Sequence, residues 1–590
     1  MSRFLSSALS MRRDPRMLKL PPYLSLVCLL VGIVWLVLLP LDNYSRRTYI
    51  SENALLPGQV HTYFGGSEQN IFRAYRRELD AFVNESNSNI NNRLELILNA
   101  AGIKVGRQIY AYNSAGNTYS GENLYGILQA PRGDATEAIV LVAAWSSIDD
   151  TFNGNGVALA LTLARYFKRW SLWSKDIIVL IPPDSRTGTQ AWVDAYHDAH
   201  DSNNVASLPL KSGALQGAIA IDYALDQTFE GVHIIYDGTN GQLPNLDLIN
   251  SIVNIGGGQM GMQTAIQGMR HHGDSYRGRL TTMLRGMLKQ GLGICAGPHS
   301  SFIPYHVDAV TLQPYGAGWH DEMAMGRVVE GTFRSLNNLL EHLHQSFFFY
   351  LLMQKDRFVS IGTYLPSAML LAANFTIMAI FLWVKSGQPS APIPGLTAAT
   401  CEKYAPELSK APQSSSPIHT TERDLSLPLG IVAGCHAASV IPLFTFNIAP
   451  ATLLPNSFAV FCVFSAVLPF VISYFLPLSF VHRTQHFQLT KSLSMLVLGM
   501  ALATLATLNF SLAFLSVISK YSVAALLNAV APPVVVYLAA HFAGLSVAEL
   551  LQQASFGWNI WAMYTPIVIW CIWWPAWLVA MTNVLIKTSD

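Results

Sequence analysis

Three continuous apolar runs follow one another in the first half of the sequence: AIVLVAAW (Ala138–Trp145), DIIVLIP (Asp176–Pro182) and GAIAIDY (Gly217–Tyr223). Such runs are typical of strands that are buried on both faces of a sheet. The segments between them, GNGVALALTLARYFKRW (154–170) and GTQAWVDAYHDAHD (188–201), have the period of a helix. This alternation of strands and helices predicts a parallel sheet.

Further segments extend the predicted sheet. GVHIIYD (Gly231–Asp237) and AVTLQP (Ala309–Pro314) are predicted strands, and RQIYAYN (107–113) with NLYGILQA (Asn123–Ala130) predicts an antiparallel edge. The amphipathic segment Arg327–Leu352 is predicted to be the last helix of the domain, running rigidly up to the membrane. The expected fold is therefore an α/β domain with a mixed, mostly parallel sheet.

The composition excludes a wholly soluble protein. The chain of 590 residues is 51% hydrophobic and 12% charged, whereas soluble domains carry about 25% charged residues. Of the 37 basic and 36 acidic residues, only eight and six lie within residues 358–590. The first part is thus soluble-like and the second membrane-like. A net charge of +1 without a basic face is not the charge distribution of a nucleic-acid-binding protein.

Seven segments are long and apolar enough to be transmembrane helices. They are Leu20–Leu41, Ile361–Val384, Leu427–Asn447, Ser457–Val481, Leu493–Ser519, Ser522–Leu545 and Trp561–Ile586. The stretch 493–545 carries only Lys520, which leaves open how it divides into helices. The expected membrane part is a helical bundle of about seven spans.

The distribution of basic residues predicts the orientation. Five basic residues and one acid precede the first span, which places residues 1–19 in the cytosol and makes residues 20–41 a retained signal anchor. Residues 42–357 are then a luminal domain, in which Asn84-Glu-Ser86 is a glycosylation sequon. Residues 358–590 form the multi-span part. Its loop 385–424, rich in Pro, Ser and Ala, is predicted to be disordered and cytosolic. The loop carrying Arg483 and Lys491 is also predicted to be cytosolic.

Polar side chains follow the predicted strands, at the edge where α/β sheets carry their chemistry. Asp149, Asp184, Asp222 and His299 are the main candidates. The pattern resembles the co-catalytic zinc aminopeptidases, in which a His-x-Asp pair, a helix-opening Asp, paired Glu residues, a further Asp and a His hold two zinc ions. Only Asp222 and His299 match that family.

The remaining metal-ligand positions differ from the family. Trp145 replaces the first His, Phe152 and Asn153 stand at the helix-opening Asp, and Pro182-Pro183-Asp184 replaces the paired Glu residues. Because zinc needs three or four donors, two vestigial positions cannot hold a metal pair. We therefore expect no catalytic residue, metal or cofactor. The alternative is a metal-dependent peptidase or amide-forming enzyme in this domain.

Four longer strings carry a second resemblance: RRTYISENALLPGQV (46–60), NLYGILQAPR (123–132), GQLPNLDLIN (241–250) and LLEHLHQSFFFYLL (339–352). With the single anchor and the multi-span half, the chain closely resembles the GPI-anchor attachment subunits of the GPI transamidase complex. This resemblance implies an endoplasmic-reticulum membrane protein. It also implies three partners: the other subunits, including a caspase-like catalytic one, the GPI lipid, and the C-terminal signal of the proprotein.

Two segments are candidates for binding GPI. Tyr49, Ser51, Glu52 and Asn53 follow the first span at headgroup height, where they could bind glycan hydroxyls or the ethanolamine ammonium. The alternative is a helix cap with Ser51 as N-cap. Pro575 in the last span would kink the helix and open space for a lipid, in a Trp-rich run that is otherwise an interfacial belt. A lipid or solute carrier with a luminal cap is a further alternative, which the absence of inverted, broken repeats disfavours.

Overall fold

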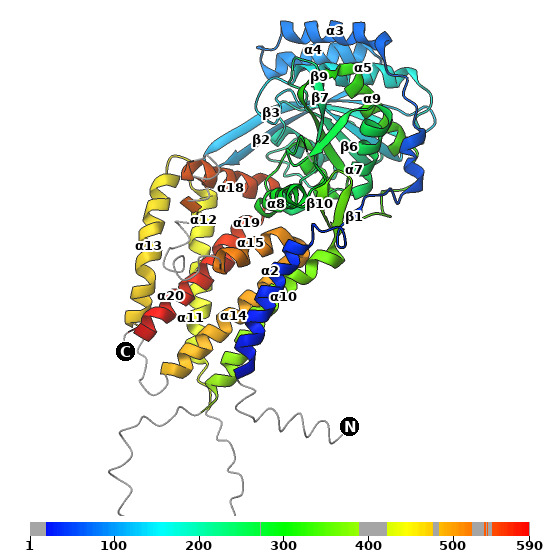
Figure 1. Ribbon diagram of the computed structural model, residues 1–590. Coiled ribbons are helices and arrows are strands. Elements are labelled where there is room, and N and C mark those ends of the chain that lie inside the picture. Colours follow the sequence, from blue (N-terminus) through cyan, green and yellow to red (C-terminus); the bar gives the residue numbers. More distant parts are fainter. Residues whose placement is uncertain are drawn as a thin grey trace, which may run out of the picture.

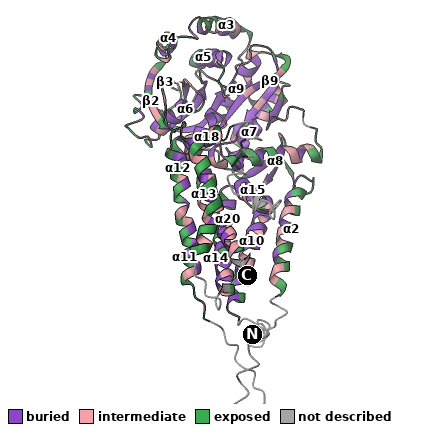
Figure 2. Ribbon diagram, turned by 90° about the vertical axis from the view of Figure 1, so that its left-hand side faces the viewer, coloured by how far each residue is buried: buried purple, intermediate pink, exposed green. Residues whose placement is uncertain are grey.

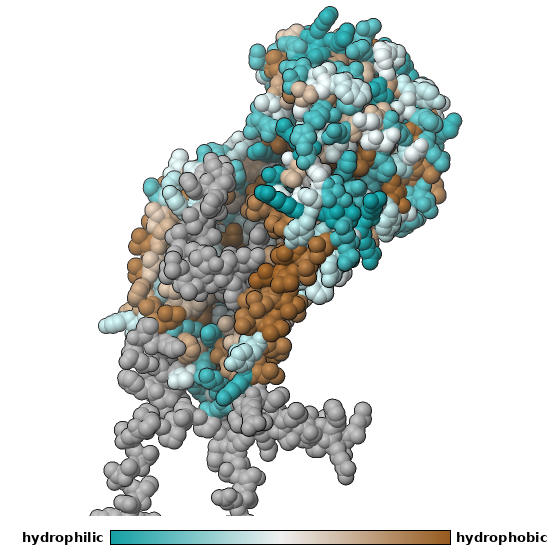
Figure 3. Space-filling view, in the orientation of Figure 1, coloured by the Kyte–Doolittle hydropathy of each residue, from teal (hydrophilic) through white to brown (hydrophobic). Residues whose placement is uncertain are grey.

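The computed structural model describes residues 19–271, 273–388, 422–475, 483–521, 536–537, 540 and 546–588. These form an α/β domain (residues 46–360) that stands on one end of an elongated helical bundle (Figure 1). The outer face of the first long helix forms a continuous apolar band below the mostly hydrophilic surface of the α/β domain (Figure 3). This contrast agrees with the division between soluble-like and membrane-like sequence.

The α/β domain is built on one eight-stranded sheet with the order β2-β3-β5-β4-β6-β9-β7-β8. Its strands are β2 (Lys104–Ser114), β3 (Asn117–Leu128), β4 (Glu137–Val142), β5 (Asp176–Ile181), β6 (Ala214–Ile221), β7 (Phe229–Ile235), β8 (Gln263–Ile266) and β9 (Ala309–His320). The pairs β4–β5, β4–β6, β6–β9 and β7–β8 are parallel, and the pairs β2–β3, β3–β5 and β7–β9 are antiparallel. The mixed, mostly parallel sheet is confirmed.

Alternate residues of the central strands enter different cores. Ile139 and Leu141 of β4 belong to the large cluster on one face, with α3 (Gly66–Ala81), α4 (Asn87–Ala100), α5 (Gly154–Arg169), α7 (Leu246–Val253) and α9 (Glu322–Asn337). Val140 and Val142 belong to the cluster on the other face, around α6 (Thr187–Tyr196). Figure 2 shows the resulting buried layer through the middle of the domain. Burial on both faces explains why these strands are continuously apolar.

The predicted helix Arg327–Leu352 is wrong beyond its first part. α9 ends at Asn337, and the apolar run that follows residue 346 leads into strand β10 (Tyr350–Gln354). β10 pairs with β11 (Arg357–Ser360), which pairs in turn with β1 (Arg46–Arg47). A short apolar run fits a strand as well as a helix, and here the hairpin partner decides the outcome. The domain thus joins the bundle through a three-stranded sheet rather than a continuous helix.

A network of charges surrounds the junction of this sheet with the bundle. Arg279 of α8 (Tyr276–Leu292) pairs with Asp42 at 2.8 Å and with Asp274 at 2.5 Å, and its Nη1 also donates to the Pro40 carbonyl at 3.0 Å. Arg357 of β11 pairs with the same two carboxylates at 2.9 and 3.4 Å. The Arg279 side chain is only 6% exposed, so it is held in one position by these partners.

We expect Arg279→Met to destabilise this junction. The change removes charge-assisted hydrogen bonds from a buried donor, which typically costs about 1–3 kcal/mol of unfolding free energy. Thermal unfolding of the full-length protein in detergent measures the loss. Arg277→Met, at an exposed position two residues earlier in the same helix, is the matched control. An equal effect of both variants would contradict the role of the network.

Six helices in the described part of the chain are long and apolar enough to cross a membrane. They span Leu20–Leu38 (α2), Ile361–Ser386 (α10), Ser426–Ile448 (α11 and α12), Leu454–Phe475 (α13), Thr484–Leu508 (within α14, Arg483–Leu508) and Thr565–Leu585 (α19 to α20). The predicted span Ser522–Leu545 and the loop 385–424 lie mostly outside the described residues. The first two spans pack together, with Trp35 Nε1 donating to the Thr363 carbonyl at 2.8 Å and Ser367 Oγ to the Gly32 carbonyl at 2.9 Å.

The predicted boundaries of the fifth span need correction. α14 begins at Arg483, so Lys491 is helical rather than in a loop, and it ends at Leu508 instead of running to Ser519. The polar residue Asn509 breaks the apolar stretch: its Oδ1 accepts a hydrogen bond from Leu512 N at 2.9 Å, at the start of α15 (Phe510–Tyr521). α15 runs at an angle to α14 (Figure 1), and the Asn509 side chain caps the first turn of α15.

Asn509 also connects the α/β domain to the bundle through hydrogen bonds. Its Nδ2 donates to the carbonyls of Asn240 at 3.0 Å and Gln290 at 2.8 Å. Asn240 in turn donates to the Ala562 carbonyl, and its Oδ1 accepts from Tyr564 N at 3.0 Å. These residues form what we call the asparagine junction (Asn240, Gln290, Asn509, Ala562 and Tyr564), a second connection between the two parts beside the three-stranded sheet.

Candidate functional site

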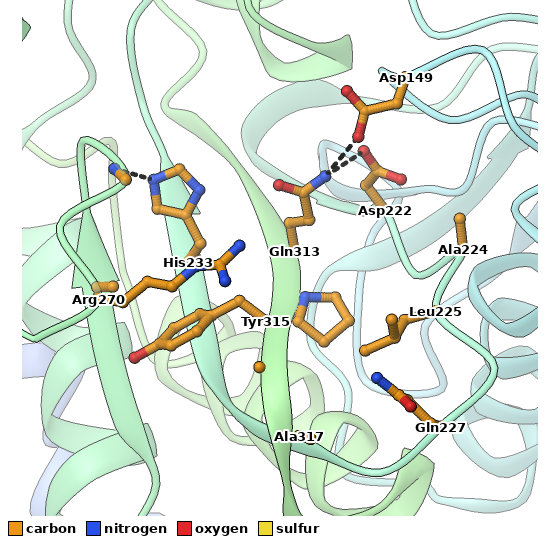
Figure 4. Close-up of a pocket in the computed structure, with 14 residues that line it drawn as sticks. Asp149, Asp222, Ala224, Leu225, Gln227, His233, Arg270, Gln313, Tyr315 and Ala317 are labelled. Carbon is orange, nitrogen blue, oxygen red and sulfur yellow. Dashed lines mark hydrogen bonds between the residues drawn. The ribbon is translucent and has the colours of Figure 1, made fainter.

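A polar pocket lies beside β6, β7 and β9, at the edge where the sequence predicted chemistry. It has a volume of about 630 Å³, and its lining includes Asp149, Asp222, His233, Arg270 and Tyr315 (Figure 4). Gln313 of β9 stands at its centre, with Nε2 facing the carboxylates of Asp149 and Asp222 at 3.5 and 3.4 Å. We call this cavity the sheet-edge pocket.

Asp222, one of the two predicted vestigial metal positions, lines this pocket. Its Oδ2 accepts a hydrogen bond from Ile148 N at 3.2 Å, while its Oδ1 is buried without a partner. Burial, reinforced by the negative charge of Asp149, raises the pKa of Asp222 to about 6. The side chain therefore holds the loop after β4 and still presents an ionised oxygen at neutral pH.

His299, the other predicted position, is not part of the pocket lining. Its ring is buried between β7 and β9, with Nδ1 at 2.7 Å from Thr311 Oγ1 and Nε2 at 3.1 Å from the Asp237 carbonyl. Burial lowers the pKa of His299 to about 4, so the ring is neutral. Both ring nitrogens of His299 thus form hydrogen bonds within the fold. The described residues contain no group of three or more His, Cys, Asp or Glu that could hold a metal ion.

The other positions of the peptidase pattern have structural contacts instead of ligand geometry. Trp145 packs between Phe82 and Phe152, with ring centroids 5.9 and 4.9 Å away. Asn153 joins the ends of β4 and β6 by donating to the carbonyls of Ala144 and Ile221 at 2.8 and 3.0 Å. An aromatic cluster and an amide bridge thus occupy the places where a metal pair would need charged donors.

Asp184 and Cys295 are also engaged structurally. Asp184 accepts hydrogen bonds from Arg186 N at 2.7 Å and Tyr110 OH at 2.8 Å, beside the start of α6. Cys295 is 7% exposed and its Sγ donates to the Gly297 carbonyl. Burial raises the pKa of this thiol to about 11, which disfavours the thiolate that a nucleophile requires.

The predicted headgroup residues lie together along α7. The backbone N–H groups of Ser51 and Glu52 donate to the Asp247 carboxylate at 2.8 to 3.1 Å, and Asn250 Nδ2 donates to the Tyr49 carbonyl. Tyr49 and Asn53 are exposed, whereas the Glu52 side chain is buried with Oε1 at 3.4 Å from Gln345 Nε2 and Oε2 without a hydrogen bond. Glu52, not the predicted Ser51, is the cap residue of the short helix Asn53–Leu55, and no side chain caps that helix.

Pro575 lies in a separate part of the bundle. It is the second residue of α20 (Trp574–Thr588) and follows a π-helical segment, η8 (Val568–Trp573), where the regular helical hydrogen bonds are interrupted. The neighbouring tryptophans are inside the bundle rather than in an interfacial belt: Trp570 is 4% and Trp574 0% exposed. Figures 1 and 2 show α2, which leads to the headgroup residues, beside α10 and away from α20.

An apolar cavity of about 300 Å³ lies next to this segment, which sequence reasoning did not identify. Its wall comes from the end of α8, from α12 (Val440–Ile448), α15 and α18 (Val547–Trp561), and from η8. Ala554, Val568, Trp570 and Trp573 are among the lining residues. We call it the bundle cavity; it adjoins the α/β domain through Gly291 and Leu292.

The sheet-edge pocket also contains residues that sequence reasoning missed. His233, Arg270, Gln313 and Tyr315 come from three segments that are far apart in the chain. The one local signal was Gln313, a polar side chain inside the apolar run AVTLQP. Tyr315 lies two positions further along the same strand and therefore on the same face.

The sequence is similar to a known protein family over most of its length. A family model described as "Gaa1-like, GPI transamidase component" matches residues 120–581. The chain is 41% identical over 378 residues to GPI transamidase component GAA1 of Saccharomyces cerevisiae, covering 63% of this chain and 59% of that protein. It is 38% identical over 379 residues to GPI transamidase component gaa1 of Schizosaccharomyces pombe, covering 61% of this chain and 64% of that protein. The matched regions thus span less than two thirds of either relative.

Solved structures similar to the chain match about half of it. A zinc-dependent exopeptidase from Bacteroides vulgatus aligns with a TM-score of 0.30 and 14% identity, covering 47% of this chain and 98% of that one. Glutaminyl cyclase from Fimbriiglobus ruber aligns with a TM-score of 0.33 and 11% identity, again covering 47% and 98%.

Proposed function

Because the chain belongs to the Gaa1-like family of GPI transamidase components, we propose that it is a noncatalytic subunit of the complex that attaches GPI to protein C-termini. In this role it binds the GPI lipid and scaffolds the complex in the endoplasmic-reticulum membrane. The N-terminus is cytosolic and the α/β domain luminal, as the basic residues of the loops favour. The single observation that supports lipid binding most is the bundle cavity.

The bundle cavity has the chemistry that a lipid tail needs. Its lining is almost wholly apolar, and an acyl chain gains about 0.8 kcal/mol for each CH₂ group that it buries. It lies directly below the α/β domain, so a lipid held there presents its headgroup to that domain. The π-helical segment before Pro575 forms part of the cavity wall through Val568, Trp570 and Trp573.

The headgroup contacts are proposed to come from Tyr49, Ser51, Glu52 and Asn53. Tyr49 and Asn53 offer exposed hydroxyl and amide groups, and the buried Glu52 carboxylate lies between them in the chain, with its Oε2 3.8 Å from His344 Nδ1. The glycan of GPI extends along the lower surface of the domain from the bundle cavity toward these residues. Peptide cleavage is assigned to a separate caspase-like subunit, which acts on the C-terminal signal of the proprotein.

We expect Glu52→Gln and Pro575→Ala each to weaken GPI retention. The first change removes the carboxylate charge that strengthens a hydrogen bond to a glycan hydroxyl, and the second restores regular helix beside the cavity. GPI that co-purifies with the full-length protein is measured by mass spectrometry, with normal co-purification of other subunits as the control. Wild-type GPI levels in both variants would show that another subunit supplies the headgroup site.

The noncatalytic assignment predicts that Asp184→Asn leaves GPI attachment nearly unchanged. Asp184 stands where the peptidase pattern has its paired Glu residues, but its contacts to Tyr110 and to backbone N–H groups are those of a helix cap, which Asn preserves. GPI-anchored proteins on the cell surface provide the measurement. A general base contributes about 10²-fold or more, so a loss of that size with normal assembly would contradict the assignment.

The alternative is that the α/β domain is itself a metal-dependent enzyme. Metal analysis of the purified full-length protein distinguishes the two: one zinc ion per chain, lost together with GPI attachment in Asp222→Ala, would refute the scaffold role. Asp226→Ala in the exposed loop after β6 is the matched control, because its carboxylate pairs only with Arg76 at the surface.

A further inference from the structure

The sheet-edge pocket has opposite charges at its two ends. At one end the carboxylates of Asp149 and Asp222 share the Nε2 of Gln313 through long contacts of 3.5 and 3.4 Å. At the other end the Arg270 guanidinium lies over the ring of Tyr315, 5.6 Å from its centroid. Figure 4 shows Gln313 between the two ends, with both charged groups turned toward the cavity.

The orientation of Gln313 is fixed by its neighbours. Gly268 N donates to His233 Nε2 at 3.1 Å, so the neutral His233 ring carries its proton on Nδ1. Burial, and then the positive charge of Lys289, lowers the pKa of His233 to about 4, and the side chain of Gln313 is its hydrogen-bond partner. The amide oxygen of Gln313 therefore faces His233, and its NH₂ group faces the carboxylates.

Two buried polar atoms in this pocket have no partner. Asp222 is 3% exposed, and its Oδ1 accepts no hydrogen bond from any described residue. Tyr315 is 6% exposed, and its hydroxyl is equally unpaired within the described ranges. Arg270 forms no ion pair with another described residue. Such groups are costly to bury unless a ligand satisfies them.

We propose that the sheet-edge pocket binds a primary ammonium group joined to a phosphate, the chemistry of ethanolamine phosphate. The ammonium has three donors for Asp149 and the free oxygen of Asp222, and the phosphate accepts from Arg270 and from the Tyr315 hydroxyl. A lysine side chain would satisfy only the acidic end, and an isolated phosphate only the basic end. At 630 Å³ the pocket also has room for the sugar next to the headgroup.

This inference rests on the proposed function for the source of the ligand, namely the ethanolamine phosphate of GPI. The α/β domain would then hold the reactive amine end of the lipid whose tails lie in the bundle cavity. The amine is bound as an ammonium ion and is not activated there, because the pocket offers two acids and no free neutral base.

The test is calorimetric titration of the full-length protein in detergent with O-phosphoethanolamine, ethanolamine, phosphate and phosphocholine. Phosphoethanolamine should bind most tightly, and Asp222→Asn and Arg270→Gln should each raise its Kd about tenfold, the effect of one lost charge-assisted hydrogen bond. Asp222→Asn keeps the acceptor for Ile148 N, and Asp226→Asn is the matched control. No binding of phosphoethanolamine, or equal Kd values in all variants, would overturn the proposal.

Two further titrations separate this proposal from the proposed function. Dispersed GPI should compete with phosphoethanolamine, whereas phosphatidylethanolamine at the same concentration should not. Competition by phosphatidylethanolamine but not by GPI would overturn the assignment to GPI. A variant with a filled bundle cavity, Ala554→Phe, should bind free phosphoethanolamine with the wild-type Kd. If the bundle cavity does not retain the lipid, the Kd of phosphoethanolamine for the sheet-edge pocket therefore stays the same.

Discussion

Filling the bundle cavity with Ala554→Phe is expected to reduce GPI attachment about tenfold or more. A ring that displaces two CH₂ groups of the acyl chain removes about 1.6 kcal/mol of burial energy, and 1.4 kcal/mol is a factor of ten. Ala554 lines the cavity from α18, and a phenyl ring at this position occupies the space proposed for an acyl chain. The substitution adds no charge and removes no hydrogen bond. The display of GPI-anchored proteins at the cell surface, normalised to the level of the variant, measures the effect.

Ala548→Phe is the matched control for this experiment. It lies on the same helix, six residues earlier, and is not part of the cavity lining. A ring at residue 548 should leave GPI attachment unchanged. If both variants attach GPI at the wild-type rate, the cavity does not hold the lipid.

Asn509→Leu is expected to separate the α/β domain from the bundle. The variant leaves the Gln290 carbonyl and the N–H of Leu512 without their partner, whereas the Asn240 carbonyl keeps its hydrogen bond from the Tyr564 hydroxyl. Each unsatisfied buried group costs about 1–3 kcal/mol. The asparagine junction should open, and GPI attachment should fall severalfold because the lipid tail and its headgroup contacts are no longer held in register. Limited proteolysis between the two parts, together with GPI attachment, provides the measurement.

The control for this variant is Thr507→Val in the same helix. Thr507 is exposed and donates only to the Thr504 carbonyl within its own helix. Proteolysis and GPI attachment should both stay at the wild-type level. A resistant, fully active Asn509→Leu variant would show that the other contacts between the two parts hold them together without this side chain. Such contacts include the hydrogen bonds from Thr565 Oγ1 to the Leu292 carbonyl and from Asn559 Nδ2 to Ser114 Oγ.

The sheet could be predicted from the sequence because its central strands are buried on both faces. Ala138–Trp145 and Ile177–Pro182 are apolar throughout, and they alternate with segments of helical period, which favours strands of a parallel sheet. Tyr350–Leu352 could not be assigned in this way. Its strand exists because Phe358 pairs with Leu352 and with Arg46, and the second of these partners lies about 300 residues away in the chain.

The candidate site was only partly predictable for a similar reason. Asp222 was found because it lies at the carboxyl end of a predicted strand, and that position alone indicates a site. His233 and Arg270 gave no local signal, since they meet Asp222 only through the order of strands β6, β9 and β7. The end of α14 had a clearer signal: Asn509 is a polar residue within an apolar stretch.

The central claim is that this protein holds GPI without performing the chemistry. The most direct measurement is the molar ratio of GPI to protein, by mass spectrometry, after purification of the full-length chain in mild detergent with the subunits that it retains. We predict close to one GPI per chain in the wild type and in Ala548→Phe, and a large loss in Ala554→Phe. A wild-type protein that supports GPI attachment but carries no GPI would contradict the claim.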